Sequence, residues 1–248
     1  MRNLLKFEFY NLFHKKSLYV CAAVMAGLLI LVKVTSWAIV QDGGISYAVC
    51  VPEAMVYGLT DADVAMFAGI FISIYVCMDF QYGTCKNIYA RGFSRGNVYV
   101  AKFVAVCVST LILYLVAMLT ELVCCRVLFG FSEYVDANYA LIFLSQIFFL
   151  LANAALIYAI GMGTRKTGTT VVFSLLTSSM VNLVLSLIDG LLDTGSFLLS
   201  DYWLETISSD IASLYTDNGR LAVCLALSVI YAALFMQAGF AVYRKRKS

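Results

Sequence analysis

Long apolar runs alternate with short polar segments along the whole chain. Six of these runs are long enough to cross the roughly 30 Å of bilayer hydrocarbon as helices. They lie near residues 18–40, 60–78, 103–128, 139–162, 170–192 and 221–243. Each run is continuously apolar, whereas the strands of a membrane barrel alternate between apolar and polar positions. The pattern therefore predicts an all-α membrane protein with six transmembrane helices, built as a single domain over residues 1–248.

The segment before the first run, residues 1–17, has the spacing of an amphipathic helix. Apolar side chains recur there at i, i+4, i+7 and i+8, which is one face of a helix. The four residues are Leu5, Phe9, Leu12 and Phe13. We predict a helix that lies in the membrane interface with its basic residues toward the lipid headgroups. A plain extension of the first transmembrane helix is the alternative.

The segment between the last two runs, residues 193–220, also has helical spacing. Its apolar positions repeat after Asp201, and they are Leu204, Ile207, Ile211 and Leu214. We therefore expect a short amphipathic helix that covers the outer end of the bundle.

Composition indicates that lipid is the solvent for much of the chain. Hydrophobic residues make up 62% of it and charged residues 13%, against roughly 45–50% and about 25% in soluble domains. The net charge of +2 is too small to indicate a nucleic-acid partner.

The charged residues outside the apolar runs divide by sign. Lys and Arg precede the first run, separate the second from the third and the fourth from the fifth, and end the chain. The remaining loops hold Asp and Glu and almost no Lys or Arg. Because loops rich in Lys and Arg stay in the cytoplasm, this distribution predicts that both termini are cytoplasmic.

Candidates for catalytic chemistry are few. The one histidine, His14, lies beside two lysines at the membrane surface, and no C-x-x-C pair indicates a metal site. Most of the eight cysteines lie in apolar runs, where cysteine behaves as a small hydrophobe. A redox role for the neighbours Cys124 and Cys125 is the less favoured alternative. The turn at 161–167 lacks the spacing of a phosphate-binding loop. We expect no catalytic residue, metal ligand or cofactor in this chain.

The loop between the second and third runs, residues 79–102, is longer than a simple connection needs. It contains a helix-compatible stretch from Thr84 to Arg91. Gly92 can end that helix in a left-handed conformation, and Ser94 can cap the helix that follows. We predict a short helix across the cytoplasmic face, with a plain basic loop as the alternative.

This loop resembles the first cytoplasmic loop of ABC-2 type permeases, the membrane subunits of one class of ATP-binding-cassette exporter. The resemblance is carried by Gly83-Thr84-x-Lys86, Gly92-x-Ser94-Arg95 and Lys102. The opening stretch, residues 6–16, is similar to the amphipathic N-terminal helix of that family. Six spans and a long outer loop before the last span complete the likeness, which implies a type V exporter-like permease bundle.

The resemblance also implies partners. Two permease subunits of this family pair with two separate ATPase subunits, and those subunits bind the ATP and Mg. This chain would then pair with a second copy or a close paralogue, and its loop helix would dock into the ATPase as a coupling helix. The N-terminal helix would touch the same partner. The loop residues so implicated are Gly83, Thr84, Lys86, Arg91, Gly92, Ser94 and Arg95.

The resemblance limits the substrate only to a broad class. It implies export of an amphipathic or hydrophobic molecule, such as a peptide, toxin or antibiotic, across a bacterial plasma membrane. Export of a lipid or polysaccharide is the alternative within the family. A regulatory or sensory membrane protein without transport is the alternative from another class.

Two charged residues interrupt the apolar runs at similar depth. Lys33 lies about fifteen residues into the first span and Glu121 about eighteen into the third, roughly 22 Å and 27 Å from the same side. Ionisable residues in a membrane usually face the bundle interior and find partners. We predict a Lys33–Glu121 pair. The alternatives are that Lys33 extends to the outer interface and that Glu121 pairs with Arg126.

Overall fold

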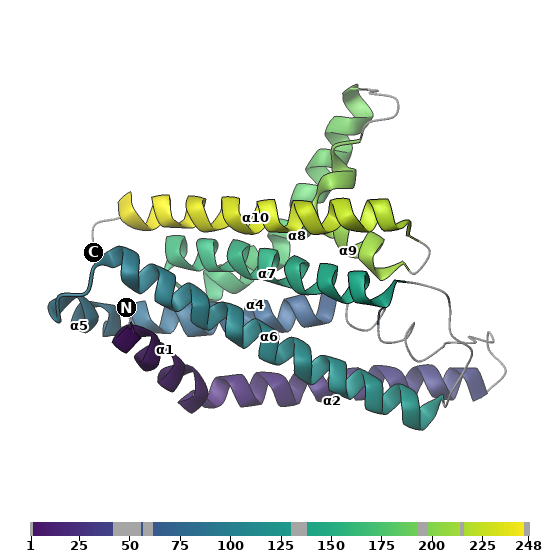
Figure 1. Ribbon diagram of the computed structural model, residues 1–248, viewed down its shortest axis with the longest axis horizontal. Helices are drawn as coiled ribbons and strands as arrows, with labels where there is room; N and C mark the ends of the chain where they lie inside the picture. Colours follow the sequence, from purple (N-terminus) through teal and green to yellow (C-terminus); the bar gives the residue numbers. More distant parts are fainter. Residues whose placement is uncertain are drawn as a thin grey trace.

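The computed structural model is a bundle of helices, and it describes residues 2–41, 56, 62–129, 138–192, 198–213 and 216–245 (Figure 1). Six helices in these ranges are long and apolar enough to cross a membrane, as predicted. They are α2 (Lys16–Gln41), α4 (Ala62–Gln81), α6 (Arg95–Leu128), α7 (Tyr139–Thr164), α8 (Thr167–Leu192) and α10 (Asn218–Lys245). The shorter elements are α1 (Arg2–His14), α5 (Thr84–Ala90), η1 (Ser200–Tyr202) and α9 (Leu204–Ala212).

Helix α7 lies at the centre of the bundle. It packs along α10 and also contacts α4, α6 and α8. Gly239 lets α10 approach closely, because a β-carbon at that position would lie 2.8 Å from Ala159 Cβ and 2.6 Å from Tyr99 Oη. Small residues allow this kind of close packing between membrane helices. The position of α10 against α7 therefore depends on Gly239.

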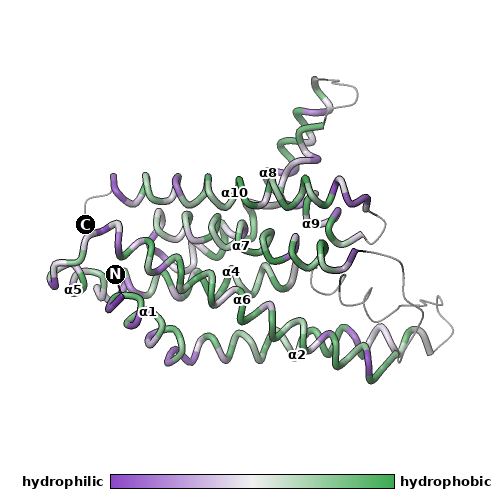
Figure 2. The backbone as a smooth tube through the Cα atoms, in the orientation of Figure 1, coloured by the Kyte–Doolittle hydropathy of each residue, from purple (hydrophilic) through white to green (hydrophobic). Residues whose placement is uncertain are grey.

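The outward faces of α2, α8 and α10 are apolar (Figure 2). Exposed large side chains include Leu31 on α2, Phe173 and Leu183 on α8, and Ile230 on α10. Exposed apolar surface of this extent indicates contact with lipid or with another apolar surface. The bundle is thus suited to the membrane solvent that the composition indicates.

Helix α1 is separate from the first membrane-crossing helix. The chain leaves helical geometry at Lys15, and α1 lies at an angle to α2 (Figure 1). The alternative of one continuous helix is therefore wrong.

The side of α1 that the bundle buries overlaps only in part with the apolar face predicted for the membrane interface. Leu4, Glu8 and Leu12 are buried, whereas Phe13 is 46% exposed. The half-buried members of the predicted face are Leu5 and Phe9. Glu8 lies at the centre of this buried side, and the hydropathy pattern gave no indication of that because a carboxylate counts as polar.

Helix α9 lies at the end of the bundle opposite the chain termini, and it has the apolar face that the sequence predicts. Its buried side chains are Leu204, Ile207 and Ile211. Leu214, the fourth predicted position, lies outside the described residues. Asp189 fixes the segment before α9, because its two carboxylate oxygens accept hydrogen bonds from the backbone N–H groups of Leu199 and Ser200, both at 2.8 Å.

Candidate functional site

Both ends of the described chain and helix α5 lie at one end of the bundle (Figure 1). Many of the basic residues belong to this end, and we therefore call it the basic end. It is defined here by Lys15, Arg91, Arg95, Lys102, Arg165 and Arg244. Most of the residues singled out from the sequence lie there.

Two left-handed glycines bracket α5. Gly83 has φ 70° and is the N-cap of α5, and Gly92 has φ 85° just after its C-terminus. Glycine adopts a positive φ without the steric cost that other residues incur. Ser94 caps α6, because its side chain accepts a hydrogen bond from the backbone N–H of Asn97. The short helix and the capping roles of Gly92 and Ser94 agree with the sequence prediction.

The other residues singled out in this loop lie in different environments. Arg91 and Arg95 are exposed, and Thr84 is half-buried. The side chain of Lys86 lies outside the described part of the structure. Lys102 is not a loop residue, since it lies in the second turn of α6 and its side chain is fully buried.

Four charged side chains meet beneath α5, and we call them the buried charge cluster: Glu8, Lys15, Asp79 and Lys102. Lys102 Nζ lies 3.1 Å from Glu8 Oε1 and also pairs with Asp79 Oδ2. Lys15 Nζ lies 3.4 Å from Asp79 Oδ1. The Tyr75 hydroxyl donates a hydrogen bond of 2.7 Å to Glu8 Oε2. Glu8 and Lys102 are both 0% exposed. The cluster thus joins α1, α4, α6 and the α1–α2 junction.

The buried charge cluster is electrically balanced, with two carboxylates and two ammonium groups. A buried charge is tolerated only when it is paired, and removal of one partner typically costs about 3–5 kcal/mol. Burial lowers the pKa of Lys15 because desolvation disfavours the ammonium form, and the nearby Asp79 carboxylate partly offsets this. The pairing therefore favours one relative position of α1, α4 and α6.

The buried charge cluster was not predicted from the sequence. By position alone, Lys15 and Lys102 are typical of basic residues outside the membrane, and the hydropathy pattern indicates no role for Glu8 or Asp79. Hydropathy evaluates each position separately, whereas the cluster depends on three helices meeting. One signal was present: Glu8 and Asp79 are acidic residues in segments otherwise rich in Lys and Arg.

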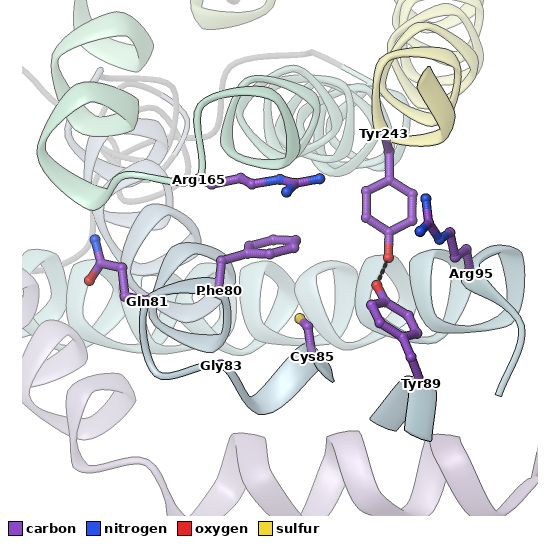
Figure 3. A pocket seen from close by; sticks show the side chains of 8 residues that line it. All are labelled: Phe80, Gln81, Gly83, Cys85, Tyr89, Arg95, Arg165 and Tyr243. Carbon is purple, nitrogen blue, oxygen red and sulfur yellow. Dashed lines mark hydrogen bonds between the residues drawn. The ribbon is translucent and has the colours of Figure 1, made fainter. Parts of the chain in front are cut away.

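A cavity of about 170 Å³ lies between α5 and the ends of α4, α7 and α10 (Figure 3). The side chains of Arg95 and Arg165 line it from two sides. The hydroxyl groups of Tyr89 and Tyr243 hydrogen-bond to each other at its edge. Burial raises the pKa of Tyr89 and raises that of the Cys85 thiol to about 11. The cavity is thus cationic and aromatic, and its one thiol is protonated at neutral pH.

The structure brings together the two charged residues singled out within the membrane. Lys33 Nζ on α2 lies 3.0 Å from Glu121 Oε2 on α6, and Glu121 is fully buried. The pair lies toward the ends of α2 and α6 that are opposite the basic end. Cys124 and Cys125, on the next turn of α6, are free thiols.

The chemistry of these groups is that of ion pairing and helix capping. Among the described residues, no group of His, Cys, Asp and Glu could hold a metal ion. The ion pairs of Lys102 connect α6 to α1 through Glu8 and to α4 through Asp79.

Comparison with known proteins places the chain in a family. A sequence model described as ABC-2 family transporter protein matches residues 4–188, which is more than half of the chain. None of the curated proteins compared with the chain matches it. The matched range includes α1 from Leu4, α5, the buried charge cluster, four of the long helices and most of α8. The chain therefore belongs to the ABC-2 family of transporter membrane proteins, the transport component that works with a separate ATPase subunit.

Proposed function

We propose that this chain is the permease subunit of an ATP-driven exporter in a bacterial plasma membrane. Two copies form the translocation pathway, and each docks an ATPase subunit at its basic end. The cargo is an amphipathic or hydrophobic molecule of the peptide, toxin or antibiotic class. Both chain termini lie in the cytoplasm, as the distribution of Lys and Arg favours.

Helix α5 is the coupling helix in this proposal. One face of it, with Cys85 and Ile88, is buried against the bundle, whereas Asn87 and Arg91 are exposed. The exposed face is therefore available to a partner. The left-handed glycines at both ends fix the direction in which α5 leaves the bundle.

The buried charge cluster is the observation that carries the proposal. It links α4 and α6, the two helices that flank α5, to α1. A displacement of α5 by the ATPase would therefore move α1 and both flanking helices together. Such a connection is what a subunit needs if ATP hydrolysis in another chain is to change its shape.

The experiment that tests this function is purification of the tagged chain from its native membrane. We expect an ATPase subunit to co-purify, and its hydrolysis rate to rise when the chain is reconstituted with an amphipathic peptide. Arg91→Glu reverses an exposed charge at the C-terminal end of α5 and should weaken co-purification. Lys166→Glu, at an exposed residue of the α7–α8 turn, is the matched control.

Two results would contradict the proposal. A chain that is stable in membranes but co-purifies with no ATPase would favour the regulatory or sensory alternative. An ATPase stimulated by lipid-linked sugars or lipids, and not by peptides, would place the substrate in the other class of the family.

A further inference from the structure

Arg165 has an unusual backbone and an unsatisfied side-chain donor. Its φ of 59° is the only positive value at a non-glycine residue in the described part of the chain. Its Nε is buried without a hydrogen-bond partner among the described residues. Its guanidinium carbon lies 5.1 Å from the centre of the Phe80 ring. A left-handed arginine is strained by about 1–2 kcal/mol, and such strain with an unsatisfied donor suggests a ligand.

Two mostly apolar grooves, each of about 370 Å³, run along α10 on either side. One lies between α7, α8 and α10, and it begins at Gly163 and Thr164, next to Arg165. The other lies between α6 and α10 and begins at Gly96, next to Arg95. Each groove therefore starts one residue from an arginine that lines the cationic cavity.

The far end of the second groove lies about one leaflet's depth from the cavity. The second groove reaches Ala233, about ten residues from Tyr243 at the cavity, which is roughly 15 Å along a helix. Half of the hydrocarbon thickness is also about 15 Å.

The position of α5 argues against the ATPase as the source of the occupant. Cys85 and Tyr89 line the cavity, whereas Asn87 and Arg91 are exposed on the opposite side of the helix. A protein docked on the exposed face would have α5 between itself and the cavity (Figure 3).

We infer that the cavity binds the phosphate of an anionic phospholipid from the adjacent leaflet. The guanidinium of Arg165 donates to the phosphate, and Arg95 contributes positive charge from α6. The two acyl chains lie in the grooves on either side of α10. Within the described residues, neither α7 nor α10 has an ion pair to the buried charge cluster. The lipid would join these two helices to α5. This site does not depend on the proposed export function.

The experiment measures thermal unfolding of the purified full chain in detergent against increasing phosphatidylglycerol. Phosphatidylcholine controls for general lipid solvation, and glycerol 3-phosphate controls for a free phosphate. A ligand that binds the folded state raises the unfolding midpoint in a concentration-dependent way. No ATPase or transport is required, so failure of the proposed function would not affect the result.

Three variants separate the headgroup site from the grooves. Arg165→Asn removes the guanidinium, and asparagine tolerates the left-handed backbone better than most residues. Lys166→Asn removes the same charge from the exposed neighbouring residue and is the matched control. Gly163→Leu fills a groove without a backbone clash, because a β-carbon there would lie 3.6 Å from Val242 Cγ1.

We expect phosphatidylglycerol, and neither control ligand, to raise the midpoint of the wild type and of Lys166→Asn. Arg165→Asn should weaken the apparent affinity by about tenfold or more, the usual effect of losing a charged hydrogen bond. Gly163→Leu should weaken the apparent affinity as well.

An unchanged response of Arg165→Asn to phosphatidylglycerol would overturn the site. Equal stabilisation by glycerol 3-phosphate, with Gly163→Leu unaffected, would identify a soluble phosphate and overturn the lipid. Equal stabilisation by phosphatidylcholine would show general solvation by lipid and would also overturn the anionic-lipid site.

Discussion

Lys102 is a long cationic side chain with no exposed surface, in a helix that crosses the membrane. It is tolerated because Glu8 and Asp79 approach it from two other helices. Its aliphatic stem packs like an apolar residue while its ammonium group is neutralised. The same residue therefore contributes to the core and fixes which helices meet at the basic end.

Removal of one charge from this cluster should destabilise the protein more than removal of a pair. Lys102→Met leaves one carboxylate uncompensated and should lower the free energy of unfolding by about 3–5 kcal/mol. Adding Glu8→Met restores charge balance, because Asp79 and Lys15 remain paired. We expect the double variant to recover most of the lost stability in thermal unfolding. Lys16→Met, at an exposed position, is the control. Strictly additive losses would show that Glu8 and Lys102 do not interact.

The Lys33–Glu121 pair allows a charge-swap test. We propose that it helps to hold the outward end of the bundle closed. Lys33→Glu and Glu121→Lys should each impair transport and thermal stability, because each replaces an ion pair with two like charges in a poor solvent. The double swap should recover much of both. The gate proposal fails if the double variant regains stability but transports as poorly as either single variant.

At the scale of elements, the end of α5 depends on the backbone geometry of Gly92. A β-carbon added at Gly92 would meet no other atom within 4 Å, so steric space is not the constraint there. Its positive φ is the constraint. A β-branched residue at such a position costs about 1–3 kcal/mol.

We therefore expect Gly92→Val to change the end of α5 and uncouple the ATPase while membrane insertion stays normal. Gly92→Asn, which tolerates the left-handed region, should retain coupling. Gly168→Val, at an open helical position in α8, controls for the added side chain. The measurement is substrate-stimulated ATP hydrolysis in proteoliposomes. If Gly92→Val transports at the wild-type rate, α5 is only a tether.

The elements that the sequence predicted well are those governed by local rules. The length of the apolar runs predicted the long helices. The capping preferences of Gly92 and Ser94 predicted a short helix between the second and third of them, where α5 lies. The start of α6 at Arg95 preceded the predicted span at 103, because hydropathy detects the apolar run and not the polar turns that precede it. The burial of Glu8 on α1 was not predicted, because Glu8 gains its partners only when α4 and α6 are in place. Contacts of this kind between distant segments leave no periodic pattern in the sequence.

At the scale of the whole molecule, the coupling proposal depends on which side of the membrane holds the basic end. The native cysteines are poor reporters of this. Cys85 is 4% exposed and its thiol pKa is raised to about 11 by burial, so little thiolate is present at neutral pH. Cys50 lies outside the described residues. Two exposed positions serve better: Tyr82 beside α5, which is 75% exposed, and Asn218 at the start of α10.

We expect Asn218→Cys to react with a membrane-impermeant maleimide in intact cells, and Tyr82→Cys to react only after permeabilisation. Both variants are made in a Cys50→Ser background, in which the remaining cysteines are partly or fully buried. Because Cys85 is three residues from Tyr82, its weak labelling in the parent chain measures the background at the same side. Protection of Tyr82→Cys by the purified ATPase would further support docking at α5. The reverse labelling pattern would put α5 outside the cell, where no cytoplasmic ATPase could reach it, and the coupling proposal would be wrong.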